Sequence, residues 1–315
     1  MTTDAVLYGV DLFGEPIRKA KAGPLAERFE FPPFSVLNAR EGEWQERKRA
    51  WLALGIKPEG RSVSGANSTT GKNSCMSWAV AGSAHLQPAN GEAGGGVVSI
   101  FDPTLCEILY KWFCPPAGQI VDPFAGGSVR GLVAGLLGFR YHGIDLRSEQ
   151  VQANEAQRDA IAPDADVAWL TGDSMELMEK APPADFIFSC PPYGDLERYS
   201  DDPLDLSTME YHAFLAAYKR IILRCAKALK PDRMACFVVG DFRDKKTGMY
   251  RGFVADTINA FREVGMPLYN DAVLVTSVGS LPVRVSGQFD GSRKLGKTHQ
   301  NVLVFAKGDP RKAFQ

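Results

Sequence analysis

Five consecutive residues in the second half of the 315-residue chain combine a stiff backbone with reactive and aromatic side chains. They are Ser189-Cys190-Pro191-Pro192-Tyr193. They follow an apolar run that is typical of a buried strand. Each proline ring fixes the backbone angle φ and removes a hydrogen-bond donor, so we expect a rigid turn. Such a turn can present the tyrosine to a pocket, where a flat aromatic ring can stack on a nucleobase taken out of a duplex.

A glycine-containing loop forms a second candidate site. Residues 119–121 read as a short apolar strand, and an apolar helix pattern begins after residue 128. The loop between them is Asp122-Pro123-Phe124-Ala125-Gly126-Gly127-Ser128. In an open parallel sheet, ligands bind beyond the carboxyl ends of the strands. Glycine at such a position lets the backbone approach a ligand closely.

Two carboxylates follow the next two strand candidates. Asp145, with Leu146 after it, lies about 20 residues beyond Gly126, where a carboxylate can accept hydrogen bonds from ribose hydroxyls. Asp173, with Ser174 after it, is a candidate for binding an adenine amino group. The order of loop and carboxylates favours a ligand that contains adenosine, and a nicotinamide dinucleotide stays open.

The elements that must position these residues alternate along the chain after residue 97. Seven apolar runs read as strands, at residues 119–121, 141–144, 165–171, 185–189, 234–239, 268–275 and 302–306. Helical patterns, such as residues 127–137 and 211–229, lie between most of them. This alternation predicts an α/β fold with a mostly parallel, seven-stranded sheet that has helices on both faces.

The first hundred residues have a different character. Trp44 and Trp51 recur at helical spacing within residues 41–54, and glycine- and serine-rich segments follow. We therefore expect an N-terminal extension with an amphipathic helix and a flexible loop at residues 1–96. The main domain is expected at residues 97–315.

Together, the two loops resemble those of the S-adenosylmethionine-dependent DNA amino-methyltransferases. Members of that family carry a loop similar to DPFAGSG, which residues 122–128 match, and then a loop of the form Asp/Asn/Ser-Pro-Pro-Tyr/Phe, which residues 190–193 match. Phe101-Asp102-Pro103 resembles the family's segment that contacts the methionine part of the cofactor. Its position ahead of both loops resembles the gamma order of motifs. The resemblance covers residues 97–308.

The resemblance implies a Rossmann-like class I methyltransferase fold. It also implies an enzyme that moves a methyl group from S-adenosylmethionine to an exocyclic amino group of cytosine or adenine, in a base extruded from double-stranded DNA at a specific site. The catalytic residues it implies are Ser189, Cys190, Pro191, Pro192 and Tyr193. The cofactor-binding residues it implies are Phe101, Asp122, Pro123, Phe124, Ala125, Gly126, Gly127, Asp145, Leu146, Asp173 and Ser174.

Cys190 departs from the family pattern, because a thiol is a weak hydrogen-bond acceptor for the target amine. In one interpretation Ser189 or a backbone carbonyl orients the amine, and Cys190 stands in for serine. In the other, Cys190 is the nucleophile of a cytosine carbon-5 methyltransferase. Amino methylation is favoured, because the carbon-5 enzymes have a proline before their cysteine, whereas here the prolines follow it. An RNA or protein methyltransferase with the same core and a non-catalytic DNA-binding protein are further alternatives.

Candidate DNA contacts lie in two loops. Arg198 follows the second motif loop, and residues 283–299 read as a flexible, locally basic loop that can follow a phosphate backbone. The candidates in this second loop are Arg284, Arg293, Lys294 and Lys297. The helix predicted at residues 41–54 also carries Arg47 and Lys48, but we expect its charged side chains to face water.

Composition limits the other possibilities. The chain is 45% hydrophobic and 23% charged, with a net charge of −1, so any DNA contact must come from local basic patches. The six cysteines form no close pair, which argues against zinc ribbons and disulfide scaffolds and favours a cytoplasmic location. No signal peptide, membrane association or metal is expected. The small recognition region favours a homodimer, although the sequence leaves the oligomeric state open.

Overall fold

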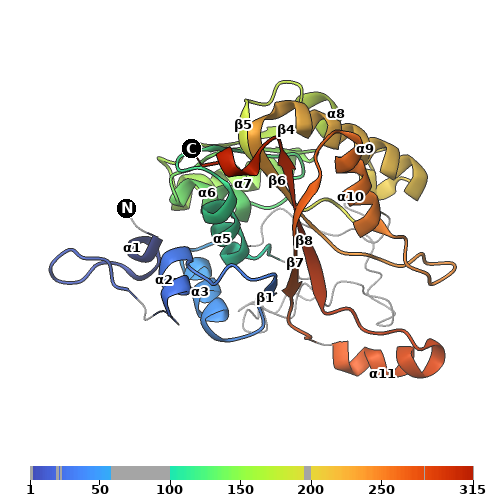
Figure 1. Ribbon diagram of the computed structural model, residues 1–315, viewed down its shortest axis with the longest axis horizontal. Helices are drawn as coiled ribbons and strands as arrows, with labels where there is room; N and C mark the ends of the chain where they lie inside the picture. Colours follow the sequence, from blue (N-terminus) through green and yellow to red (C-terminus); the bar gives the residue numbers. More distant parts are fainter. Residues whose placement is uncertain are drawn as a thin grey trace.

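The computed structural model describes residues 3–18, 21, 23–57, 100–194, 200–279 and 281–314, and it contains one eight-stranded sheet (Figure 1). In spatial order the strands are β1 (Val36–Asn38), β7 (Leu268–Val275), β8 (His299–Lys307), β6 (Leu229–Val239), β5 (Ala184–Ser189), β2 (Gln119–Asp122), β3 (Arg140–Asp145) and β4 (Val167–Thr171). Neighbouring strands are parallel, except that β8 runs antiparallel to β6 and to β7. The fold is therefore a mostly parallel, Rossmann-like α/β fold.

Helices cover both faces of this sheet (Figure 1). One core joins the sheet to α3 (Gly42–Ala53), α5 (Pro103–Phe113), α6 (Val129–Leu136) and α7 (Ser148–Ile161). A second core joins it to α9 (Tyr211–Ala228) and α10 (Phe253–Glu263). The shorter helices are α1 (Thr3–Tyr8), α2 (Pro24–Phe29), α8 (Ser174–Leu177), η2 (Leu206–Thr208) and η3 (Pro310–Lys312). Among the residues described, no helix has both the length and the apolar character needed to cross a bilayer.

Strand β6 shows why the sheet needs helices on both sides. Met234 and Cys236 pack in the first core, whereas Ala235 and Phe237 pack in the second. Successive side chains of a strand point to opposite faces, so a strand that is apolar throughout must be covered twice. Strands of this kind are typical of a mostly parallel sheet.

The chain reverses its course across the sheet between β2 and β5. From β2 it passes outward through β3 to β4, and it then returns to β5, on the other side of β2, before it continues to β6. The crevice at the carboxyl ends of the strands at such a reversal is the usual ligand site of an open α/β sheet. Both motif loops, residues 122–128 and 189–193, lie at this point.

Each of the seven predicted strands overlaps a strand of the structure, and the helices predicted at residues 127–137 and 211–229 are α6 and α9. The predicted number of strands is wrong, because β1 adds an eighth strand parallel to β7 at the edge of the sheet. Of its three residues only Leu37 is buried, too short a pattern to indicate a strand. The boundary predicted between residues 96 and 97 lies outside the described residues.

The helix predicted at residues 41–54 is α3, but the expectation that its charges face water is wrong for Arg47. The Arg47 side chain is 1% exposed, and its Nε lies 2.7 Å from Oε2 of Glu107 in α5. Asp4 of α1 and Glu30, next to α2, also pair with this guanidinium. A buried charge needs such partners. The first three helices are therefore tied to α5 by ion pairs as well as by apolar contacts.

Residues 283–299 also differ from the predicted flexible loop. Leu281–Ser292 form a helix, α11, and a segment without regular secondary structure then leads into β8. Figure 1 shows α11 lying away from the sheet. The loop was predicted because glycine is unfavourable inside a helix, but local propensity is a weak guide to a single segment. Gly287 and Gly291 are both accommodated within α11.

Candidate active site

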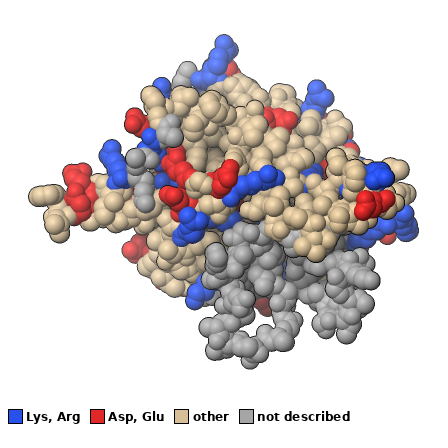
Figure 2. Space-filling model, turned by 90° about the horizontal axis from the view of Figure 1, so that it is seen from below, with Lys and Arg blue, Asp and Glu red and all other residues tan. Residues whose placement is uncertain are grey.

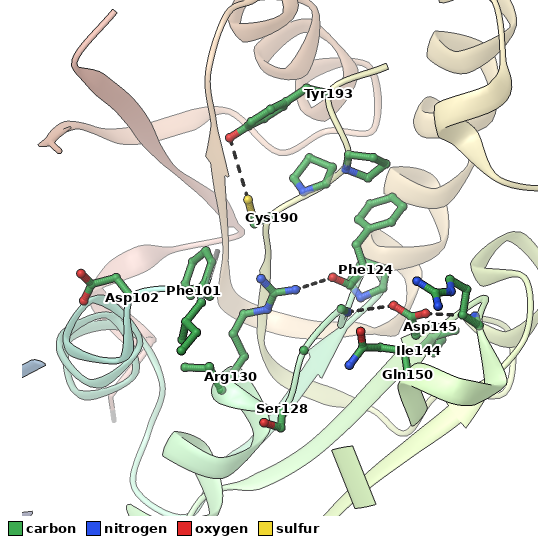
Figure 3. Close-up of a pocket in the computed structure, with 18 of the residues that line it drawn as sticks. Phe101, Asp102, Phe124, Ser128, Arg130, Ile144, Asp145, Gln150, Cys190 and Tyr193 are labelled. Carbon is green, nitrogen blue, oxygen red and sulfur yellow. Dashed lines mark hydrogen bonds between the residues drawn. The ribbon is translucent and has the colours of Figure 1, made fainter. Parts of the chain in front are cut away.

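A pocket opens at the carboxyl ends of β2 and β5, where the chain reverses its course across the sheet. Both motif loops line it, together with the start of α5, the ends of β3 and β4, and residues of α3. In Figure 3, Phe101 and Asp102 lie at one end and Asp145 lies toward the opposite end, while Cys190 and Tyr193 form a third side. The pocket therefore has separate regions that could hold two ligands at once.

Asp122 supports the glycine loop from behind rather than from inside the pocket. Its carboxylate is fully buried and accepts hydrogen bonds from the hydroxyls of Tyr141 (2.8 Å) and Ser189 (2.5 Å). It also pairs with Arg130, at 2.5 Å from Nε to Oδ2. Although burial acts to lower the pKa of Arg130, the Asp122 carboxylate raises it above its usual value. Asp122 and Ala125, both predicted to contact the cofactor, do not line the pocket.

Arg130 holds the backbone of the same loop. Its Nη2 donates to the carbonyl oxygens of Phe124 and Ala125, and its guanidinium lies 4.8 Å from the centre of the Phe101 ring. Sequence reasoning missed this residue, although a signal was present. Arg130 is the charged residue of the otherwise apolar helix α6, and arginine is almost never fully buried unless it is paired.

The predicted carboxylates at the ends of β3 and β4 do line the pocket. Asp145 accepts hydrogen bonds from the backbone N–H groups of Gly126 and Arg147, both at 3.0 Å. Asp173 caps α8 by accepting from Met175 N (2.8 Å). A carboxylate has acceptor sites beyond these, so both can still bind a ligand. The other predicted cofactor residues that line the pocket are Phe101, Pro123, Phe124, Gly126, Gly127, Leu146 and Ser174.

The glycine loop leaves room for a polar ligand. A Cβ atom at Gly127 would have no heavy atom within 4 Å, so the backbone there faces open space. Gly126 has φ of +54°, which favours glycine. The Ser128 hydroxyl lines the pocket and is buried, with no hydrogen-bond partner among the described residues. Because an unpaired buried hydroxyl costs free energy, this residue fits a ligand that offers a hydrogen bond.

The second motif loop contains residues of two kinds. Ser189 is fully buried and its hydroxyl donates to Asp122, which argues against the interpretation in which Ser189 orients a target amine. The residues that line the pocket are Cys190, Pro191, Pro192 and Tyr193. Cys190 is partly exposed, whereas the other described cysteines, Cys106, Cys114, Cys225 and Cys236, are buried.

Tyr193 is held by contacts that the sequence does not indicate. Its hydroxyl accepts a hydrogen bond from Gln300 Nε2 (2.6 Å) and lies 3.9 Å from Sγ of Cys190. Phe242 and Phe253 pack against its ring, at 6.4 and 6.1 Å between ring centres. The ring orientation is therefore fixed before any substrate binds. Gln300 lies on β8, and no motif marks it.

A hairpin at residues 240–252 begins beside this ring. A Cβ at Gly240 would lie 3.8 Å from the Tyr193 hydroxyl and 3.7 Å from Nζ of Lys297. Arg243 stacks on the ring of Tyr250, with its Cζ 3.9 Å from the ring centre. Asp244 caps the turn by accepting from two backbone N–H groups. The hairpin is thus a preformed structure at the rim of the pocket.

The predicted DNA-contacting residues are only partly brought together. Lys294 lies against Gly248 of the hairpin, and Lys297 donates to the Asp241 carbonyl oxygen at 3.2 Å. Burial lowers the pKa of Lys297, and the charge of Arg243 acts in the same direction. Arg293 is exposed and lies directly after α11. Arg198 and the side chain of Arg284 lie outside the described part of the chain.

Comparisons with known proteins give structural similarity only. No protein-family model matches the sequence, and no curated protein matches it. TrmN from Thermus thermophilus is similar at a TM-score of 0.45 and 15% identity, over 66% of this chain and 49% of TrmN, about half its length. A methyltransferase from Methanosarcina mazei is similar with a TM-score of 0.44 and 15% sequence identity, over 64% of this chain and 97% of that protein. Magnesium protoporphyrin IX methyltransferase from Synechocystis, with bound S-adenosylmethionine, is similar with a TM-score of 0.41 and 11% sequence identity. The similarity covers 68% of this chain and 87% of that protein. These values are too low to carry a conclusion about this chain.

Proposed function

We propose that this chain is an S-adenosylmethionine-dependent methyltransferase that acts on an exocyclic amino group of cytosine or adenine in DNA. The observation that carries the proposal is the convergence of two sequence motifs on one pocket. The loops at residues 122–128 and 189–193 are distant in sequence, yet they follow adjacent strands and line the same space. A transfer enzyme needs this arrangement, because donor and acceptor must be held side by side.

The residues near β3 and β4 fit the adenosine part of the cofactor. Asp145 would accept hydrogen bonds from the ribose hydroxyls, and Asp173 lies where it can accept from an adenine amino group. Gly126 and Gly127 let the backbone approach the ligand, and Ser128 supplies a hydroxyl that needs a partner. When bound, the cofactor supplies a methyl group made electrophilic by the positive sulfonium.

The second motif loop would hold the acceptor base. Tyr193 offers an aromatic ring whose position is fixed by Gln300 and by the ring of Phe242. The backbone of the loop and Cys190 would direct the lone pair of the target nitrogen toward the methyl group, because Ser189 is turned away. No residue has to form a covalent bond in this mechanism. Placement of two reactants supplies most of the catalysis.

Local features of the rim support a nucleic-acid partner. Figure 2 shows blue and red side chains interspersed on one face, with large tan areas between them, so this face has no continuous basic field. Cations at the hairpin and before β8 (Arg243, Lys246, Lys294 and Lys297) are the candidates for phosphate contacts beside the pocket. Arg243 also stacks on an aromatic ring. Such a combination of cations and aromatic rings is common in proteins that bind nucleic acids.

The test is nucleoside mass spectrometry of duplex DNA after incubation with the protein and S-adenosylmethionine. We expect a methyl group on an amino nitrogen of adenine or cytosine. Methyl on carbon 5 of cytosine would replace the amino mechanism with one in which Cys190 is the nucleophile. Unmodified DNA, in a sample for which calorimetry shows cofactor binding, would direct nucleoside analysis to RNA and peptide mass spectrometry to protein substrates.

A further inference from the structure

The N-terminal helix α3 carries a feature that the proposed function does not use. Its single lysine, Lys48, lines the pocket, and the Nζ atom lies 3.2 Å from Oδ2 of Asp102. The Lys48 side chain is only 16% exposed. Asp102 caps α5 and also accepts a hydrogen bond from the indole of Trp44. Trp44 and Lys48 are one helical turn apart, so α3 reaches Asp102 with two neighbouring side chains.

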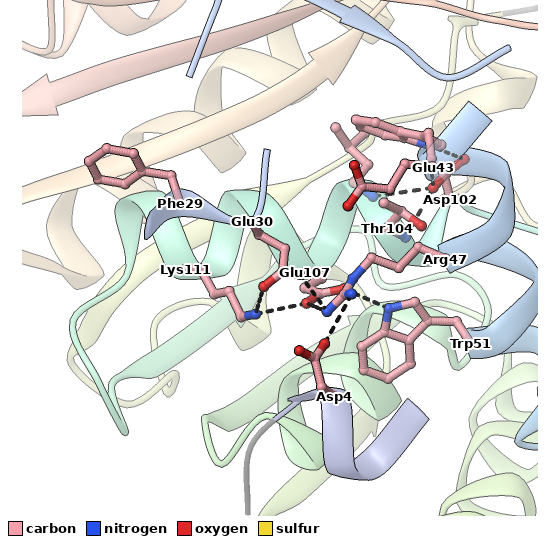
Figure 4. A network of polar contacts seen from close by, with 12 residues as sticks. Asp4, Phe29, Glu30, Glu43, Arg47, Trp51, Asp102, Thr104, Glu107 and Lys111 are labelled. Atoms are coloured by element: carbon pink, nitrogen blue, oxygen red, sulfur yellow. Dashed lines mark hydrogen bonds and ion pairs between the residues drawn. The ribbon is translucent and has the colours of Figure 1, made fainter. Parts of the chain in front are cut away.

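A buried polar network holds α3 in this position (Figure 4). Arg47, directly before Lys48, donates through Nε and Nη2 to both carboxylate oxygens of Glu107 at 2.7 Å. Trp51 donates to the same carboxylate at 2.8 Å. Glu30 joins the network, and although burial acts to raise its pKa, Lys111 and Arg47 lower it to about 2. The position of Lys48 is therefore fixed by contacts on another side of the helix.

Four cations line the pocket within the described part of the chain: Lys48, Lys57, Arg130 and Arg147. Arg130 is committed to Asp122 and to loop carbonyl oxygens. Arg147 follows Asp145, at the ribose end. The backbone of Lys57 pairs with the Gln157 side chain of α7. At the end of the pocket away from Asp145, Arg130 stacks on Phe101 but is committed to the glycine loop, and Lys48 is the cation that pairs with Asp102.

We propose that Lys48 binds the carboxylate of the amino-acid part of S-adenosylmethionine. This inference rests on the proposed function. With the adenosine part at Asp145, the amino-acid part must extend toward Phe101 and Asp102, and its carboxylate requires a positive partner. An ammonium has three N–H donors, and the partner that the structure gives Lys48 is Asp102. A carboxylate can therefore be added without loss of the existing ion pair.

The inference gives the N-terminal segment a role in the site. Residues 23–57 add β1 to the sheet and pack α3 on α5, and they contribute Ala39, Gln45, Lys48 and Lys57 to the lining of the pocket. Loss of this segment would therefore remove a ligand contact as well as part of the core.

The test compares two ligands by titration calorimetry. S-adenosylhomocysteine contains the amino-acid part, whereas 5′-methylthioadenosine has the same adenosine and sulfur without it. For Lys48→Met we expect an affinity for S-adenosylhomocysteine about ten-fold lower, the scale of one charge-assisted contact, and an unchanged affinity for 5′-methylthioadenosine. Lys48→Arg, which keeps the charge, should retain most of the wild-type affinity for S-adenosylhomocysteine. Lys219→Met, on α9 and away from the pocket lining, is the control and should leave the affinities for both ligands unchanged.

A second variant separates direct binding from neutralisation of Asp102. If Lys48 only neutralised that carboxylate, the double variant Lys48→Met with Asp102→Asn would regain the lost affinity, and this result would overturn the inference. An equal loss for both ligands, or no loss for either, would also overturn it. A wild-type protein that bound neither ligand would contradict the proposed function itself. Thermal unfolding of each variant identifies any that has lost its fold.

Discussion

The two motif loops follow neighbouring strands of one sheet, yet they turn different parts of their chemistry toward the pocket. In the loop at residues 122–128 the charged side chain, Asp122, is buried and paired with Arg130, so the backbone and Ser128 face the pocket. In the loop at residues 189–193 the side chains of Cys190 and Tyr193 line the pocket. One hydrogen bond, from the Ser189 hydroxyl to Asp122, joins the two loops.

This difference separates two kinds of functional residue. In the first loop the side chains set the shape of the backbone, so their substitution should act mainly on stability and cofactor affinity. In the proposed function the side chains of the second loop would meet the substrate, so their substitution should act on transfer while cofactor affinity stays intact. Variants in the two loops can therefore test whether the assignment is correct.

The largest effect is expected from Arg130→Ala. This change leaves the Asp122 carboxylate buried without its cation and releases two loop carbonyls. Breaking a buried ion pair from one side costs about 3–5 kcal/mol in the free energy of unfolding. Urea denaturation measures this loss. Lys219→Ala, which breaks an exposed ion pair with Glu263, is the control and should cost no more than about 1 kcal/mol.

A small loss of stability in Arg130→Ala, together with a complete loss of cofactor binding, would contradict this view of the first loop. Arg130 would then act on the ligand rather than on the loop. The double variant with Asp122→Ala gives an independent check. If the two side chains act as one unit, the second substitution should add little to the cost of the first.

The next largest effect is expected from Tyr193→Ala in the second loop. Removal of a ring that stacks on a base costs about 1–3 kcal/mol, so the rate of methyl transfer should fall by about five- to 150-fold. Tyr193→Phe keeps the ring and removes only the hydrogen bond from Gln300, so its loss should stay below about ten-fold. Single-turnover transfer of labelled methyl to DNA measures both. An unchanged rate in Tyr193→Ala would exclude a role for the ring in holding the base.

The contrast between the loops also explains how far the sequence could lead. The alternation of apolar runs predicted the strands and the place where both loops meet, because these depend on backbone topology. The motifs also included most of the residues that line the pocket, but they did not indicate that Asp122, Ala125 and Ser189 are turned away from it. Asp122 was expected to contact a ligand and Arg47 to face water, but each is buried in an ion pair with a residue on another element. Such pairings depend on tertiary contacts that no local pattern encodes.

A smaller effect is expected from Cys190→Ser. If Cys190 only stands in for a serine near the target amine, transfer should stay within about ten-fold of the wild-type rate, since a hydroxyl is the better acceptor. Cys190→Ala should behave similarly if the loop backbone supplies the main contact. Complete loss of transfer in both variants, with cofactor affinity retained, would instead indicate a nucleophilic thiolate and carbon-5 chemistry. Mass spectrometry of the product from the wild-type protein provides the independent check.

The smallest effect is expected at the rim, where Lys246 of the hairpin is exposed and Lys297 is held by the Asp241 carbonyl. A surface lysine that contacts one phosphate contributes about one unit to the slope of log affinity against log salt concentration. We expect Lys246→Ala to lower this slope by about one unit on duplex DNA of random sequence, as measured by fluorescence anisotropy. Lys219→Ala, on α9, should leave the slope unchanged. Equal slopes for Lys246→Ala and Lys219→Ala would place the DNA on another face of the protein. In the wild-type protein, a steeper slope with RNA than with DNA would favour RNA as the partner. Because binding at the rim and transfer in the pocket are measured separately, this result decides the partner without depending on either motif loop.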